Sequence, residues 1–209
     1  MYESFYLLGR MPFENAPDPT FLHLSGDHRE VLSALGDGIA SGKEWLLLTG
    51  DAGTGKTILI QSLLKTLDAN LIVIPVAHLH ARFEEILYEL SQQLSLHFID
   101  RSNFSDIYNK IKFRLAQVHK GGKRAVLIID EAHLLDEAGM ESLKHFSDHV
   151  NQERPLLQFL LAGQPEIFDT LRRGSSPRMM DRITLSCRLH PMGNRSRRSS
   201  MMRISWLFA

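Results

Sequence analysis

The eight residues from Gly50 to Thr57, GDAGTGKT, have the composition of a loop that binds phosphate groups. An apolar run precedes this loop, and an amphipathic helical pattern follows it. Glycine allows backbone conformations that other residues resist, so successive N–H groups can point at phosphate oxygens, and the start of a helix adds a positive end. Lys56 is expected to reach the β- and γ-phosphates, and the Thr57 hydroxyl is expected to bind Mg²⁺. The sequence therefore predicts a nucleotide site formed by Gly50, Asp51, Ala52, Gly53, Thr54, Gly55, Lys56 and Thr57.

Two adjacent carboxylates follow a second apolar run, in RAVLIIDEAH. Asp130 comes where a buried strand would end, and it can complete the shell of a Mg²⁺ ion. Glu131 comes next and can orient and deprotonate an attacking water molecule. An acidic pair in this position can also be no more than the lead into a helix. Its combination with the phosphate loop favours a catalytic site that hydrolyses a nucleotide over one that transfers phosphate to another substrate.

A polar residue at the end of the next apolar run, in LLQFLLAGQPEI, is placed to sense the γ-phosphate. That residue is Gln164, and the alternative is that it belongs only to a turn into the next helix. An arginine further along could reach the γ-phosphate of a neighbouring subunit. Solvated surface charge is the alternative for each of the four candidates, which are Arg172, Arg173, Arg178 and Arg182.

The elements that must position these residues alternate along the chain. Predicted strands cover 45–49, 71–77, 124–130, 156–162 and 183–189, and predicted helices cover 25–42, 55–67, 82–94, 105–119, 136–152 and 165–173. The strands are almost continuously apolar, as in a sheet that is buried on both faces. This order predicts an α/β fold with three layers, in which helices cover both faces of a five-stranded, mainly parallel sheet.

Composition and charge limit the class of protein. The chain has 209 residues, 44% hydrophobic and 23% charged, which fits one globular domain. The longest apolar run, 71–77, is far shorter than the ~20 residues of a membrane span, and no signal peptide is apparent. With Cys187 as the only cysteine, we expect a cytoplasmic location. Residues 1–171 hold 15 Lys+Arg against 23 Asp+Glu, whereas residues 172–209 hold nine Arg against one acid. The basic end could bind nucleic acid or could simply be disordered.

Two missing motifs narrow the nucleotide and the family. The Asn-Lys-x-Asp motif that reads guanine is absent, because Asn109-Lys110-Ile111-Lys112 lacks the acid, and ATP is therefore the expected nucleotide. The stretch LSGDH at residues 24–28 departs from the LSGGQ signature of transporter ATPases, which argues against that class.

The motifs taken together resemble the ExeA-type (general secretion pathway protein A) AAA+ ATPases. The resemblance runs through MPFENAPDPTFLHL, LLLTGDAGTGKT, VLIIDEAHLL and LQFLLAGQPEI, in this order, over about residues 1–192. It implies a P-loop AAA+ fold, a cytoplasmic ATPase that forms ATP-driven oligomers, and a role in assembling the envelope complex of type II secretion or a related pilus system. It also implies that the lead-in with Phe13 and Phe21 folds over the adenine.

The resemblance assigns roles to individual residues. Lys56 and Thr57 bind phosphate and Mg²⁺, Asp130 and Glu131 are the Walker B pair, and Gln164 takes the first sensor position. Near the last strand the family pattern Arg-Gln-Arg-Ile is replaced by MDRI, so that Arg182 is the candidate arginine finger.

The end of the sequence departs from the family pattern. After RLHPM the family continues into a helical lid, whereas this sequence reads GNRSRRSSMMRISWLFA. We expect a lead-in and helix at 1–42, the ATPase core at 43–192 and an aberrant or disordered Arg-rich tail at 193–209. A truncated or frameshifted reading frame would explain the missing lid, and a natural short basic tail is the alternative. Without a lid, weak turnover and weak assembly are expected.

Two other functions stay open at this point. A nucleotide-switched, DNA-binding regulator of transposition would share the phosphate loop and the Asp-Glu-Ala-His sequence, and the Arg-rich end fits DNA. A domain that binds the nucleotide only for structural reasons is the third possibility.

Overall fold

The computed structural model describes residues 26–76, 82–96, 104–173, 178–191 and 201–202. In chain order its helices and strands are α2 (Gly26–Ala40), β1 (Trp45–Gly50), α3 (Lys56–Thr66), β2 (Leu71–Val76), α4 (Phe83–Gln93), α5 (Phe104–Lys120), β3 (Arg124–Ile129), the 3₁₀ turn η2 (Ala132–Leu134), α6 (Glu137–Val150), β4 (Leu157–Gly163), α7 (Ile167–Arg173), α8 (Arg178–Arg182), β5 (Ile183–Leu189) and β6 (Met201–Met202). None of these helices has both the length and the apolar character that crossing a membrane requires.

The strands form one sheet in the order β2-β3-β4-β1-β5-β6. All pairs from β2 to β5 are parallel, which confirms the predicted α/β fold with its five parallel strands. The two-residue strand β6 adds an antiparallel pair at the edge, opposite Ser186 and Cys187, within the stretch that we expected to be disordered. Because the strands are parallel, the loops that follow β1, β3 and β4 all leave the same edge of the sheet.

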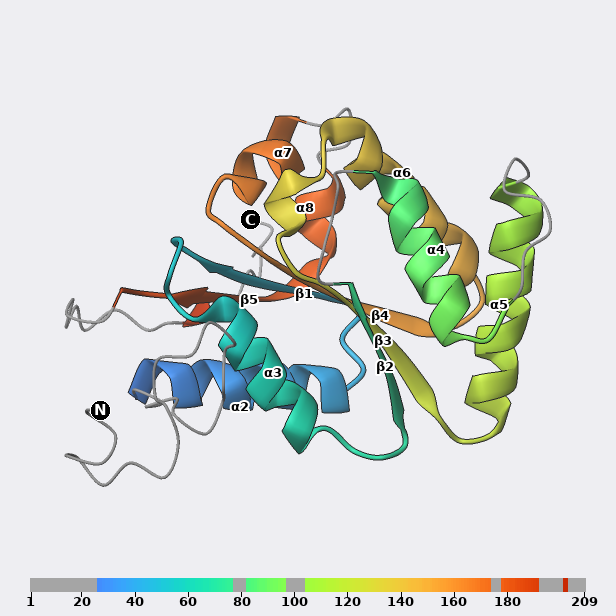
Figure 1. Cartoon of the computed structure of the whole chain (residues 1–209), viewed down its shortest axis with the longest axis horizontal. Coiled ribbons are helices and arrows are strands. Elements are labelled where there is room, and N and C mark those ends of the chain that lie inside the picture. Colours follow the sequence, from blue (N-terminus) through green and yellow to red (C-terminus); the bar gives the residue numbers. More distant parts are fainter. Residues whose placement is uncertain (1–25, 77–81, 97–103, 174–177, 192–200, 203–209) are drawn as a thin grey trace, which may run out of the picture.

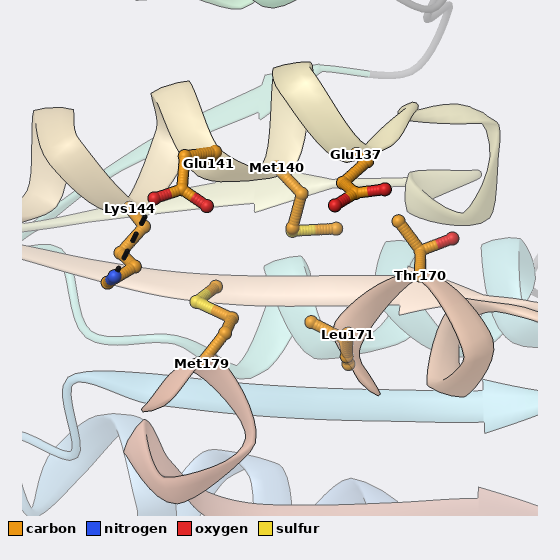
Figure 2. Close-up of a pocket in the computed structure, with 7 residues that line it drawn as sticks. All are labelled: Glu137, Met140, Glu141, Lys144, Thr170, Leu171 and Met179. Carbon is orange, nitrogen blue, oxygen red and sulfur yellow. Dashed lines mark ion pairs between the residues drawn. The ribbon is translucent and has the colours of Figure 1, made fainter. Parts of the chain in front are cut away.

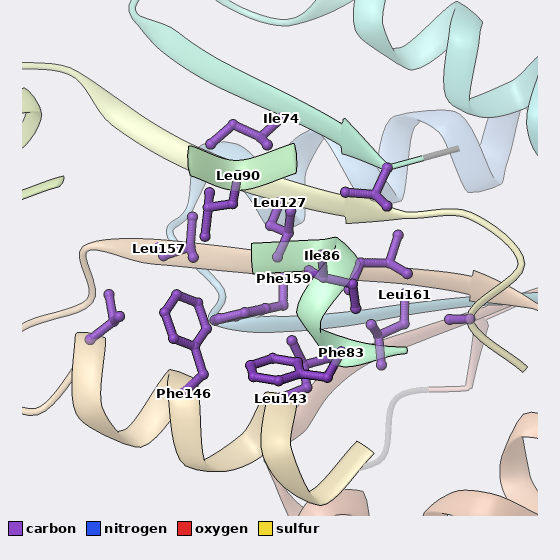
Figure 3. Close-up of a cluster of buried hydrophobic side chains, with 14 of the residues drawn as sticks. Ile74, Phe83, Ile86, Leu90, Leu127, Leu143, Phe146, Leu157, Phe159 and Leu161 are labelled. Atoms are coloured by element: carbon purple, nitrogen blue, oxygen red, sulfur yellow. The ribbon is translucent and has the colours of Figure 1, made fainter. Parts of the chain in front are cut away.

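The helices cover the sheet on both faces (Figure 1). Helices α2 and α3 lie on one face, and α4 to α8 lie on the other. The larger of the two cores joins α4, α5 and α6 to the sheet, with Phe83 and Phe146 close together (Figure 3) and their ring centroids 6.1 Å apart. In the same core Trp45 of β1 stacks on Phe159 of β4, with ring centroids 4.2 Å apart. These two apolar layers hold β1, β3 and β4, the strands that carry the predicted site.

All of the predicted strands and helices are present, with ends that differ by at most two residues. The structure adds η2, α8 and β6, which were not predicted. All three are too short for an apolar period to be visible in the sequence. Helix α2 shares a core with α3 and β5, so it packs as part of the sheet's cover. The expected domain boundaries at 42 and 192 stay predictions, and Phe13 and Phe21 lie outside the described residues.

Candidate functional site

The phosphate loop leaves the carboxyl end of β1 and turns directly into α3. Gly53 has φ 76° and Gly55 has φ 91°, both in the left-handed region that favours glycine. Gly55 is also the residue before the first turn of α3, so its conformation sets the direction in which the helix starts. Free N–H groups at this helix start provide a positive end for an anion.

Lys56 begins α3 and turns its ammonium group back into the loop. The side chain is 6% exposed, and Nζ donates to the backbone oxygens of Gly50 at 2.8 Å and of Asp51 at 3.1 Å. These two carbonyl groups hold the charge inside the curve of the loop. A phosphate group bound in the loop would therefore meet a cation that is already in position.

Thr57 and Asp130 lie together although 73 residues separate them in the sequence. The Thr57 hydroxyl donates to Oδ2 of Asp130 at 2.8 Å, and the N–H of Glu131 donates to Oδ1 at 2.9 Å. Asp130 is 7% exposed and directly follows β3, whereas Thr57 is exposed. A hydroxyl and a carboxylate are the hard oxygen ligands that Mg²⁺ prefers, so this donor pair fits the ion.

Glu131 and Gln164 face the phosphate loop across one cavity. The cavity has a volume of about 350 Å³ and is lined by Ala52, Gly53, Gly55, Lys56, Thr57, Ile58, Glu131 and Gln164. Glu131 adopts a left-handed conformation, with φ 55°, and its side chain is 39% exposed. Such a conformation is unfavourable for a residue with a side chain, and it is often found at functional sites. The fold thus brings together the residues for which binding, base and sensor roles are predicted; the roles themselves stay predictions.

Two histidines at the site were not singled out from the sequence. His28 in the first turn of α2 is 2% exposed, and its Nε2–H donates to the backbone oxygen of Thr54 at 3.0 Å. His133 in η2 lies 3.0 Å from the amide nitrogen of Gln164, measured from Nε2. In the sequence, His28 stands out only as part of LSGDH, the stretch that departs from the transporter signature. Both contacts join segments that are distant in the sequence, so no local pattern reveals them.

Arg182 lies at the opposite edge of the sheet from the phosphate loop. It precedes β5, whose first residue pairs with Trp45, whereas the last residue of β5 pairs with Gly50 next to the loop. Six residues of strand separate the two edges, roughly 20 Å. The Arg182 guanidinium forms an ion pair with Asp148 at 2.5 Å. Arg182 therefore cannot reach the nucleotide of its own chain, and its role as a finger toward a neighbouring chain stays a prediction.

A second, much smaller cavity lies between α6 and the pair α7 and α8. Figure 2 shows Met140 and Met179 facing each other there, beside the ion pair of Lys144 with Glu141, which spans 4.0 Å. Its volume is about 10 Å³, room for about one water molecule. This space is too small to hold a nucleotide or a peptide side chain.

Cys187 is buried in β5 and does not contribute a reactive group. Burial in the core raises the pKa of its thiol to about 11, with a smaller contribution from the charge of Glu30. The thiol is therefore neutral at physiological pH and behaves as a small apolar side chain.

Comparison with known proteins places the chain in a family. Residues 39–171 match the AAA domain family, and because they make up more than half of the chain, the chain belongs to this family. The chain is also 30% identical over 194 residues to General secretion pathway protein A of Aeromonas hydrophila, which confirms the resemblance seen in the motifs. The match covers 93% of this chain and 36% of that protein, so the chain spans about a third of its relative's length.

Solved structures agree on the fold. The ORC2 protein of Aeropyrum pernix, solved as ADPNP-ADP complexes, has a TM-score of 0.65 at 16% identity, covering 86% of this chain and 51% of that one. The ORC1 protein of the same organism, in complex with DNA, has a TM-score of 0.61 at 18% identity, covering 90% and 49%. At these identities the similarity establishes the shared α/β fold and nothing further.

Proposed function

We propose that this chain is an ATPase domain that binds Mg-ATP and hydrolyses it. The observation that carries the proposal is the hydrogen bond between Thr57 and Asp130, 2.8 Å long, at the mouth of the loop that holds Lys56. This hydrogen bond joins the end of β3 to the start of α3. A cation bound to the phosphates would need the Thr57 hydroxyl oxygen and the Asp130 carboxylate oxygen at this point. Membership of the AAA family, in which nucleotide binding is general, supports the same reading.

Each residue of the site has a defined part in the proposed reaction. The backbone N–H groups of the loop and Lys56 bind and orient the phosphates, and Thr57 with Asp130 would hold Mg²⁺. Bound Mg²⁺ supplies charge neutralisation for the phosphate oxygens. Glu131 accepts the proton of the attacking water molecule, and Gln164 contacts the γ-phosphate. Arg182 of one chain would reach the ATP of a neighbouring chain in an oligomer.

The cellular role that we propose is assistance in assembling a type II secretion or related pilus complex. Similarity to General secretion pathway protein A supports this role, since it extends over nearly the whole of this chain. The proposal includes a cytoplasmic location, self-association driven by ATP and contacts with other components of the secretion complex.

Calorimetry and steady-state turnover test the ATPase proposal together. Lys56→Ala should weaken Mg-ATP binding by about 100-fold or more, because each charge-assisted hydrogen bond contributes roughly 1.5 to 3 kcal/mol. Glu131→Gln should leave binding within a few fold of the parent and slow hydrolysis, since an amide has nearly the shape of a carboxylate but accepts no proton. An unchanged Mg-ATP affinity in Lys56→Ala would contradict the phosphate site. A turnover of Glu131→Gln equal to that of the parent would show that Glu131 is not the base.

The alternative role as a DNA-binding regulator of transposition uses the same nucleotide site. A gel-shift titration with duplex DNA at increasing salt separates the two, because binding through phosphate contacts weakens steeply with salt. We expect no salt-sensitive shift at physiological ionic strength. A steep salt dependence with nanomolar binding would favour the regulator.

A further inference from the structure

His133 lies between the two residues to which the proposed function assigns the base and the sensor. Its side chain is 11% exposed, with Nε2 at 3.0 Å from the amide nitrogen of Gln164 and Nδ1 at 3.5 Å from Oε2 of Glu131. The left-handed conformation of Glu131 turns the chain into η2, which brings a side chain two residues later back beside that of Glu131. The imidazole ring thus connects the end of β3 to the end of β4.

The contacts define the direction of the hydrogen bonds. An amide N–H can only donate, so Nε2 of His133 accepts from Gln164. In a neutral imidazole whose Nε2 accepts, the proton is on Nδ1, the nitrogen that faces Glu131. Within the described part of the chain, Nδ1 is a buried atom that has no partner at full hydrogen-bond geometry. A small movement of Glu131 toward the ring would close a chain of two hydrogen bonds that ends on the carboxylate.

The backbone of β4 leaves the ring little freedom. A Cβ atom added to Gly163 would lie 3.0 Å from the backbone nitrogen of His133 and 3.4 Å from its Nδ1. This close approach holds η2 against the end of the strand that carries Gln164. Because the Gln164 amide also lies 3.0 Å from Nε2, a displacement of Gln164 acts on the imidazole through that contact.

From this geometry we propose that His133 is a positioning residue that couples Gln164 to Glu131. When Gln164 shifts toward a γ-phosphate, it pulls the imidazole through the hydrogen bond to Nε2. The Nδ1–H group then moves relative to the Glu131 carboxylate, which acts on the water molecule. The inference rests on the proposed ATPase function for its purpose, whereas the hydrogen bond from Gln164 to Nε2 and the 3.5 Å approach of Nδ1 to Glu131 are features of the structure itself. His133 is not among the residues that line the cavity beside the phosphate loop, so it acts through Glu131.

The tautomer of His133 tests the hydrogen-bond chain without any turnover. Nitrogen-15 NMR of the nucleotide-free full chain at pH 8 should show His133 protonated on Nδ1, and Gln164→Ala should shift it away from that form. The signal is assigned by its loss in His133→Asn. A ring protonated on Nε2 in the parent, a doubly protonated ring, or a tautomer unaffected by Gln164→Ala would each overturn the proposal.

Turnover of matched variants tests the coupling. Asparagine places its amide near the position of Nδ1 and can still reach Glu131, whereas glutamine places its amide near Nε2 and can still reach Gln164. His133→Gln loses the group that faces the Glu131 carboxylate and should lower kcat about 10- to 100-fold, as expected for losing a hydrogen bond to a charged group. His133→Asn loses only the hydrogen bond to the neutral amide of Gln164 and should lower kcat about 2- to 10-fold. Both variants should keep their Mg-ATP affinity within a few fold of the parent. Calorimetry of ATP binding serves as the control for folding.

A double-variant comparison distinguishes coupling from two independent effects. His133→Asn combined with Gln164→Ala should be no slower than the slower single variant, because both changes break one chain. A kcat of His133→Asn equal to that of the parent would contradict the coupling. So would a double variant whose loss of kcat is the product of the two single losses. If the parent chain itself turns over no ATP, the proposed function fails, while the NMR result still decides whether the hydrogen-bond chain exists.

Discussion

Replacing Gly163 by alanine tests the close packing between β4 and the turn that carries His133. The added Cβ would lie 3.0 Å from the backbone nitrogen of His133 and 3.3 Å from its Cβ. A backbone atom cannot rotate away as the end of a flexible side chain can, so η2 must shift by a few tenths of an ångström. Overpacking of this kind costs about 1 to 3 kcal/mol, of which roughly 0.4 to 1 kcal/mol is recovered because alanine restricts the unfolded chain.

In the middle of these ranges, the expected net destabilisation of Gly163→Ala is about 1 to 2 kcal/mol. In a chain of this size that corresponds to a Tm lower by roughly 3 to 6 °C. Gly163 does not line the cavity beside the phosphate loop, so Mg-ATP affinity should stay within a few fold of the parent. Turnover should fall, because the shift of η2 displaces the imidazole from Glu131 and Gln164.

Gly36→Ala is the matched control for this substitution. Gly36 lies inside α2, and a Cβ added there would meet nothing within 4 Å. Alanine should stabilise the chain by about 0.4 to 1 kcal/mol, because it favours the helix and restricts the unfolded state. Thermal unfolding of both variants, followed by calorimetric titration with Mg-ATP, gives the comparison. A Tm for Gly163→Ala that equals or exceeds that of the parent would refute the packing argument.

Three further predictions follow from single contacts. His28→Ala should lower the free energy of unfolding by about 1 to 3 kcal/mol and weaken Mg-ATP binding, because it removes the buried hydrogen bond to Thr54. Chemical denaturation measures the stability, and calorimetry measures the affinity. An unchanged denaturation midpoint would contradict the predicted loss of stability. Arg182→Ala should change stability by less than about 1 kcal/mol, since its ion pair is partly exposed, and should lower turnover only at concentrations at which chains associate; a rate loss in the dilute monomer would exclude a finger role. Cys187 should not react with a thiol reagent at pH 8 until the chain is unfolded, and rapid labelling of the folded chain would show that the thiol is not buried.

The sequence by itself determined the fold class and the parts of the site that are local. The loop from Gly50 to Thr57 works through backbone conformations that its own glycines allow, so the motif and its chemistry are visible together. The same holds for Asp130 and Glu131, because the apolar run before them predicts a buried strand and places both carboxylates at its end. Alternation of strands and helices then predicted a parallel sheet, which the structure confirms.

Only the tertiary structure determined which polar groups meet. The contacts of His28 with Thr54 and of His133 with Gln164 span 26 and 31 residues, and they depend on how α2 and η2 pack against the sheet. Likewise, the distance of Arg182 from its own phosphate loop follows from the strand order and from the pairing of β5 with β1. A sequence pattern reports the preferences of neighbouring residues, whereas these contacts arise from hydrophobic cores that form between distant segments, and the free energy of such packing overrides local preference.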